Sequence, residues 1–135
     1  MACQQRNQCS YSDGSIVRYT YIVTPRGPRS CATKTYIQIL CTYLSPGVWE
    51  ADLTAGGTLT VTTQGVPGEW SAVFVGFPTP GPGPNPCTDL PADVDDTVLR
   101  DDCFGYHLRT ELIYNDGSSV EIVTRIDLLN NAGCM

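Results

Sequence analysis

The side chain best suited to acid–base chemistry is His107, the single histidine of the chain. It lies in an alternating run and points away from the face that carries Tyr106 and Leu108. A hydrolase triad would require a nucleophile and an orienting acid beside it, and the chain has no G-x-S-x-G motif. We therefore interpret His107 as a satisfied or solvent-facing strand histidine. The sequence predicts no catalytic residue and a protein that is not an enzyme.

A run of acids at residues 89–102 is the other chemical feature, with a net charge of −5 in a chain of net charge −6. Its oxygens at alternating positions make a weak candidate for calcium, with Asp93, Asp95 and Asp96 as ligands. The run lacks the glycine and glutamate of an EF-hand loop. We therefore predict a solvated acidic turn or a short helix capped by Asp93, and no metal or cofactor.

Seven cysteines are present without any C-x-x-C pair, which disfavours zinc ribbons and redox motifs. We predict a disulfide framework with one thiol left over. Cys87 and Cys103 bracket the acidic segment, and a disulfide between them would close that loop. Cys41 is predicted to be the free thiol, because it lines up with Ile37 and Ile39 on the apolar face of a strand.

Disulfides indicate an oxidising compartment, but residues 1–10 lack the apolar stretch of a signal peptide. The signal could have been removed, the thiols could stay reduced in a cytosol, or the protein could be made in a cytosol and work outside it after lysis. We favour the third explanation, which fits virus particle proteins. No transmembrane run is present, so we expect no membrane association. Lys34 is the only lysine and no basic stripe exists, so we expect no nucleic-acid partner.

The elements that must position these residues are strands. Residues 106–128 form two alternating arms around a turn at Asn115–Ser118, which predicts a half-buried hairpin. One hairpin is not stable alone. Further strands are predicted at residues 16–24, 35–44, 48–53, 58–63 and 70–77. The sequence thus predicts an all-β fold with one domain over residues 1–135, an antiparallel β-sandwich of about seven strands. A Pro-rich loop and a short helical or irregular acidic insertion are expected within it, and these two segments together span residues 78–103.

Two further side-chain groups have alternative interpretations. Trp49 and Trp70 could form a sugar-binding platform, but at strand positions they are more often part of the core. Arg26 and Arg29 lie in the loop at residues 25–30, where we expect both to be exposed.

Prolines at alternate positions form a stiff extended arm. We expect this arm to contact a neighbouring subunit through Pro78, Pro80, Pro82, Pro84 and Pro86.

These features favour a non-enzymatic structural protein of a virus or phage particle, a capsid decoration (cement) or tail component located in the virion. Its expected partners are capsid or tail subunits or further copies of itself. The alternative is a secreted, disulfide-bonded binding or adhesion domain, with carbohydrate as one ligand class. An acid-catalysed hydrolase is the third hypothesis.

Overall fold

The computed structural model describes residues 4–5, 8–9, 11–29, 31–54, 56–63, 70–76, 87 and 89–130, and this part of the chain contains strands but no helix. The strands are β1 (Gln4–Gln5), β2 (Gln8–Cys9), β3 (Ile16–Arg26), β4 (Thr35–Ser45), β5 (Val48–Asp52), β6 (Thr58–Thr62), β7 (Ser71–Val75), β8 (Asp93–Asp102), β9 (Gly105–Ile113) and β10 (Ser119–Asn130). The all-β prediction is confirmed. No helix in the described residues has the length and apolar composition to cross a membrane.

Eight strands form one antiparallel sheet in the order β7-β6-β5-β4-β3-β10-β9-β8, while β1 and β2 pair with each other. The sheet consists of two meanders, β3 to β7 and β8 to β10, which are joined where β3 and β10 pair along their lengths. The prediction of about seven strands in a sandwich is therefore close. The difference is that a single curled sheet supplies both layers.

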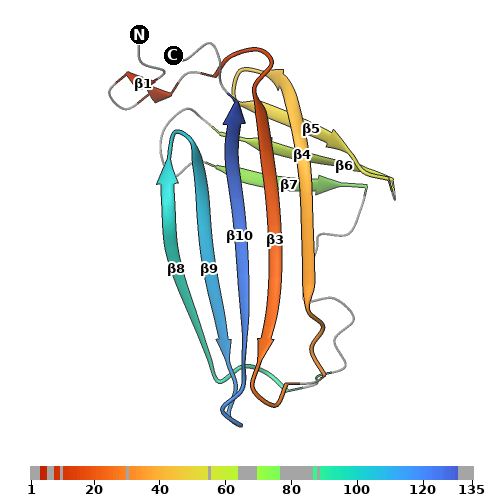
Figure 1. Cartoon of the computed structure of the whole chain (residues 1–135), viewed down its shortest axis with the longest axis vertical. Coiled ribbons are helices and arrows are strands. Elements are labelled where there is room, and N and C mark those ends of the chain that lie inside the picture. The colour runs from red at the N-terminus through yellow and green to blue at the C-terminus, as the bar shows by residue number, and fades with distance from the viewer. Residues whose placement is uncertain are drawn as a thin grey trace.

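The curl begins between β4 and β5. Their pairing stops at Thr42 and Glu50, and a bulge lies between Tyr43 and Ser45. Bulges bend a strand and increase its twist. As a result β5, β6 and β7 cross behind the long strands, and the molecule has the form of a half-barrel (Figure 1).

The core fills the space between the long strands and β5 to β7. Trp49 and Trp70 stack at its centre with ring centroids 5.5 Å apart, and the ring of Tyr19 meets that of Phe74 edge to face. Trp49 is fully buried and Trp70 nearly so. Both tryptophans therefore belong to the core, so they cannot form an exposed sugar platform.

The acidic segment is a strand, and the prediction of a helix or an irregular insertion is wrong. β8 pairs with β9 along its length and forms one edge of the sheet. Val94, Thr97 and Val98 are β-branched and favour an extended backbone, and aspartate is a poor helix former. Charged side chains and a bulge near Arg100 are typical of edge strands that resist further pairing.

The loop arginine Arg29 is buried, which corrects the expectation that it is exposed. Its guanidinium donates two hydrogen bonds to Asp89, at 2.9 and 2.6 Å, and Nε donates a third to Ser118 at 2.9 Å. It also lies 3.4 Å from the ring centroid of Tyr114. Arg29 thus ties two loops to the β9–β10 turn. Arg26 is exposed, as expected.

The predicted disulfide between Cys87 and Cys103 is wrong. Cys87 is bonded to Cys31, 56 residues earlier in the sequence, and Cys103 is disulfide-bonded elsewhere. Spacing along the chain favoured the shorter loop, but β8 carries the acidic segment away from Cys87 as an extended strand. The prediction of Cys41 as a free buried thiol is confirmed.

Candidate functional site

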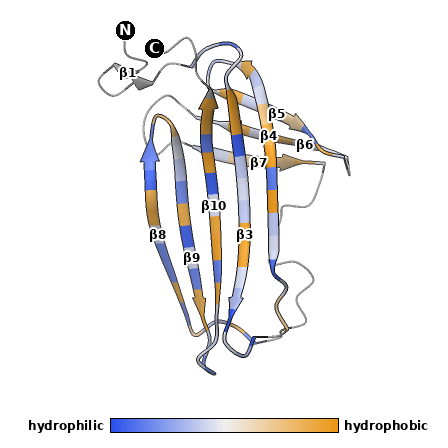
Figure 2. Cartoon of the chain, viewed as in Figure 1, coloured by the Kyte–Doolittle hydropathy of each residue, from blue (hydrophilic) through white to orange (hydrophobic). Residues whose placement is uncertain are grey.

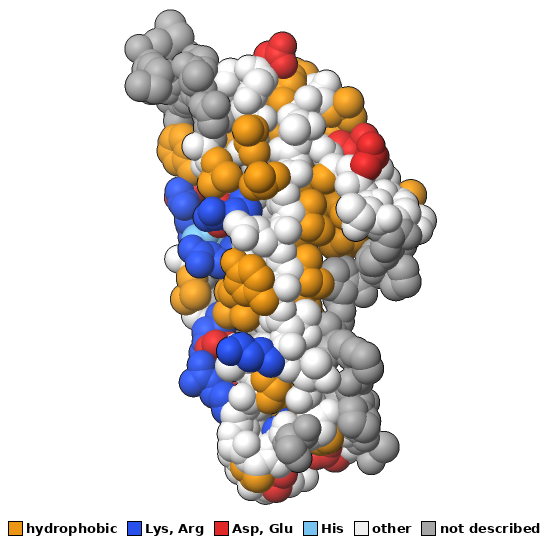
Figure 3. All heavy atoms as spheres, turned by 45° about the vertical axis from the view of Figure 1, so that its right-hand side comes forward, with side chains coloured by type: hydrophobic (Ala, Val, Ile, Leu, Met, Phe, Trp, Pro, Cys, Tyr) orange, Lys and Arg blue, Asp and Glu red, His pale blue; other side chains and the backbone are white. Residues whose placement is uncertain are grey.

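The face of β3, β4, β9 and β10 that points away from the core is called here the outer face. Along these strands apolar and polar residues alternate (Figure 2). The apolar members pack inward, so that the alternate side chains of β3, β9 and β10 form a polar outer surface. Arginines gather on one side of this surface and apolar side chains lie beside them (Figure 3).

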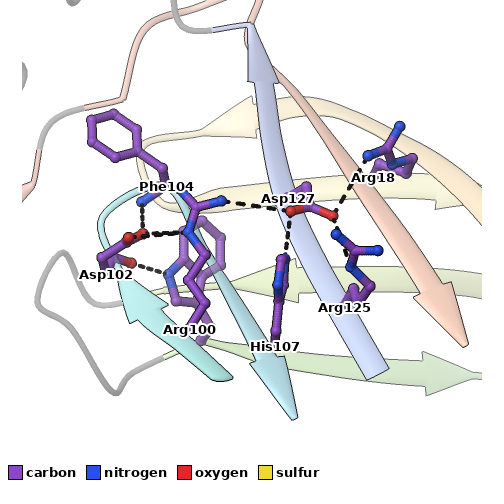
Figure 4. A network of polar contacts seen from close by, with 8 residues as sticks. Arg18, Arg100, Asp102, Phe104, His107, Arg125 and Asp127 are labelled. Carbon is purple, nitrogen blue, oxygen red and sulfur yellow. Dashed lines mark hydrogen bonds and ion pairs between the residues drawn. The ribbon is translucent and has the colours of Figure 1, made fainter. Parts of the chain in front are cut away.

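Three arginines and one histidine surround one carboxylate on the outer face. We call it the Asp127 cluster, and it comprises Arg18 on β3, Arg100 on β8, His107 on β9, and Arg125 and Asp127 on β10. His107 donates from Nε2 to Oδ1 of Asp127 over 2.6 Å. The three arginines approach the same carboxylate at ion-pair distances of 3.7, 3.8 and 4.0 Å. Figure 4 shows the side chains of Arg18, Arg100, His107 and Arg125 converging on Asp127.

Asp127 lies beneath the cations, with 7% of its surface exposed. Its Oδ2 atom accepts no hydrogen bond from any described residue. Arg18 and Arg125 are more exposed and donate no hydrogen bond within the described part of the chain. A guanidinium has five N–H donors. These two groups therefore present donors to solvent and are suited to binding a carboxylate or another oxyanion.

A second ion-pair group lies further along the same face. Glu121 accepts hydrogen bonds from Arg109 Nε at 2.6 Å and from Arg26 at 3.1 Å. The hydrogen bond from Arg109 holds the pKa of Glu121 below its usual value, despite the opposing effect of burial. Here too the arginines are more exposed than the acid. The surface of this acidic protein is thus locally rich in guanidinium groups.

Beside the arginines lie three exposed apolar side chains of β4, separated by the polar Gln38 and Thr42, which we call the apolar strip. Tyr36 and Leu40 are 63% and 56% exposed, and Leu44 is exposed to a similar degree. Where β4 and β5 diverge, the surface is hollowed by a cavity of about 300 Å³ lined by Leu40, Thr42, Tyr43, Leu44, Glu50, Ala51 and Asp52. The hollow has an apolar wall and two carboxylates, and it is the right size for a side chain from a partner.

No protein-family model, no curated protein and no solved structure matches this chain.

The structure places His107 as the sequence interpretation has it, as a strand histidine satisfied by a neighbour. The calcium candidates do not converge. Asp95 and Asp96 are on opposite faces of β8, and Asp96 accepts a hydrogen bond from Thr110 at 2.6 Å. Among the described residues no group of three or more His, Cys, Asp or Glu side chains could hold a metal ion. The proline contacts predicted at residues 78–86 lie outside the described residues.

Asp127 and its arginines were not identified as a site from the sequence. Alternation put Arg125 and Asp127 on one face, and the turn at Asn115–Ser118 implied that β9 and β10 pair. Counting back from this turn would have set His107 beside Arg125, as the structure has it. Nothing comparable indicated Arg18 or Arg100, because they reach the cluster only through the pairing of β3 with β10 and of β8 with β9.

Proposed function

We propose that this protein is a non-enzymatic structural protein that docks its outer face against a neighbouring protein in a larger assembly. A virus or phage particle is the setting we favour, with the chain acting as a capsid decoration (cement) or tail component. The observation that carries the proposal is the exposed apolar strip, Tyr36 and Leu40, beside the arginines of the Asp127 cluster. Tyrosine and arginine are enriched at protein interfaces and among the residues that dominate binding energy.

Charge supports a protein partner of a particular kind. The guanidinium groups of Arg18 and Arg125 are directed to solvent, and the acids that pair with them lie underneath. A partner surface with carboxylates around an apolar centre would satisfy these donors and exclude water from the strip. Ion pairs of exposed arginines contribute little to stability within one chain, so binding is the better explanation for the collection of these arginines on one face.

The hydrolase hypothesis has less support. His107 is hydrogen-bonded to Asp127, and no described serine, threonine or cysteine is hydrogen-bonded to the imidazole. A His–Asp pair without a nucleophile lacks the arrangement of a triad.

The alternative of a secreted binding or adhesion domain is favoured by one observation, the Cys31–Cys87 disulfide, which fits an extracellular protein. The buried tryptophans argue against a carbohydrate platform.

The test is association with particles. The tagged full-length chain would be produced in cells that make the particles of its source, and the lysate separated on a density gradient. We expect the wild type to sediment with the particles. Leu40→Asp should remain in the light fractions, because a buried unpaired carboxylate in the apolar strip opposes docking.

Val94→Asp is the matched control, since Val94 is 51% exposed but lies on β8 facing away from the outer face. It should sediment with the particles. The proposal fails if the wild type stays in the light fractions, or if Leu40→Asp sediments with particles as well as Val94→Asp does.

A further inference from the structure

The outer face carries opposite charges on its two sides. The Asp127 cluster lies over β3, β8, β9 and β10, while Glu50 and Asp52 lie on β5 across the apolar strip. Neither Glu50 nor Asp52 forms an ion pair with a described residue, and Arg18 and Arg125 donate no hydrogen bond to one. Each chain therefore has, on the same surface, guanidinium groups with unused N–H donors and carboxylates without an ion pair.

The Asp127 cluster and the carboxylates of Glu50 and Asp52 lie at nearly the same height along the strands. Asp127 pairs with Arg18, and Arg18 pairs with Leu40. Leu40 is two residues from Thr42, whose partner on β5 is Glu50. A step of two residues along a strand is about 7 Å. The cations and carboxylates thus differ in level by little more than the reach of an arginine side chain.

This arrangement is self-complementary. A second copy can be rotated by 180° about an axis parallel to β3 and placed with its outer face against that of the first. This rotation exchanges the two sides of the outer face but keeps every residue at the same height along the strands. The arginines of each copy then lie over Glu50 and Asp52 of the other. Such a pairing is isologous, so every contact occurs twice and the assembly closes at two subunits.

The surface is large enough for a stable pair. The four strands of the outer face, about 4.8 Å apart and about ten residues long, cover roughly 630 Å². Two copies would therefore bury roughly 1,260 Å² in total, which lies at the lower end of specific, stable interfaces. The apolar strip would lie near the axis, where side chains of one copy can enter the hollow beside Leu40 and Leu44 of the other. Anchors that fill pockets near the centre of an interface carry most of its energy.

We infer that the partner on the outer face is a second copy of this chain, in a two-fold dimer held by Arg18 and Arg125 of each subunit against Glu50 and Asp52 of the other. This inference rests on the proposed docking function of the outer face and names its occupant. It also predicts that reversing one charge removes two ion pairs per dimer.

The experiment is sedimentation velocity on the purified full-length chain over a range of concentrations. The wild type is expected to sediment at twice the monomer mass of 14.6 kDa. Tyr36→Asp and Arg125→Asp should each weaken dimerisation at least tenfold. The combined variant Arg125→Asp/Asp52→Arg should recover most of the loss, because the charges are exchanged in both subunits. Val94→Asp should dimerise as the wild type does.

Thermal melting of each variant separates loss of folding from loss of association, and Tyr36→Asp leaves the Asp127 cluster intact. A wild type that stays monomeric at its highest soluble concentration overturns the dimer, as does a paired charge reversal that recovers nothing. A monomeric wild type that still sediments with particles through Leu40 would refute self-association and leave the proposed function standing.

Discussion

Nε2 of His107 lies 2.6 Å from Oδ1 of Asp127, on neighbouring strands of the sheet and on the arginine-rich side of the outer face. This contact leaves Oδ2 for Arg18 and Arg125. One nearly buried acid therefore lies within ion-pair distance of arginines from three strands: Arg18 on β3, Arg100 on β8 and Arg125 on β10. Without it, mutual repulsion would spread the guanidinium groups. Asp127 is best described as the residue that organises the outer face.

Replacing Asp127 by asparagine should destabilise the protein. The substitution keeps the size of the side chain but removes the carboxylate that the three arginines and His107 share. Breaking a buried ion pair costs about 3–5 kcal/mol, and the partial exposure of these arginines reduces the expected loss to about 2 kcal/mol. Urea unfolding would measure it. The exposed Asp13→Asn is the control, and equal stability of the two variants would contradict the organising role.

The strands of this fold were largely predictable. Alternation located β3, β4, β5, β6, β7, β9 and β10 to within a few residues, because each has one apolar face against the core. β8 was not predicted, because residues 93–102 are rich in aspartate. An edge strand can keep both faces partly in solvent, so the alternation of apolar and polar residues along it is weak. The acidic composition therefore favoured a turn or a short helix instead of a strand.

The site was predictable only in part, because it depends on pairing between distant segments. Strand patterns say which side chains share a face, but they do not say that β3 lies beside β10. That pairing alone brings Arg18 to Asp127. The burial of Arg29 and the bond from Cys31 to Cys87 have the same cause, since both join loops that are close only after the sheet has curled.

Arg29 should be more important for stability than any other arginine. Arg29→Met leaves Ser118 and Asp89 without the Arg29 donor and removes the stacking on Tyr114, so we expect a clear fall in the melting temperature. Arg29→Lys should recover less than half, because an ammonium cannot donate in parallel to both oxygens of Asp89. Thermal unfolding would test this, with the exposed Arg26→Met as control. A lysine variant as stable as the wild type would contradict the role of the bidentate pair.

Low pH should reduce the stability contributed by the carboxylates around Arg29. The hydrogen bond from Arg29 lowers the pKa of Asp89, and the hydrogen bond from Ser118 lowers that of Asp116. A folded-state pKa below the unfolded value means that the stabilisation is complete above the unfolded pKa and is lost as the pH falls through the folded value. Melting temperature should therefore fall steeply below about pH 4. Asp89→Asn should flatten that dependence, whereas the unpaired Asp52→Asn should leave its slope unchanged. An equal flattening by both variants would count against Asp89.

The free thiol of Cys41 should be almost inert while the protein is folded. Cys41 is fully buried among the apolar side chains of β4 and its neighbours, and burial raises its pKa to about 11. At pH 8 about one thiol in a thousand would be ionised, compared with about one in four for an ordinary cysteine. Since the thiolate is the reactive form, alkylation by iodoacetamide should be at least a hundredfold slower than for a model thiol. Mass spectrometry of the peptide containing Cys41 would follow the reaction, and addition of urea should restore the normal rate. Rapid alkylation of the folded protein would show that β4 opens readily at this position and that Cys41 is not part of a closed core.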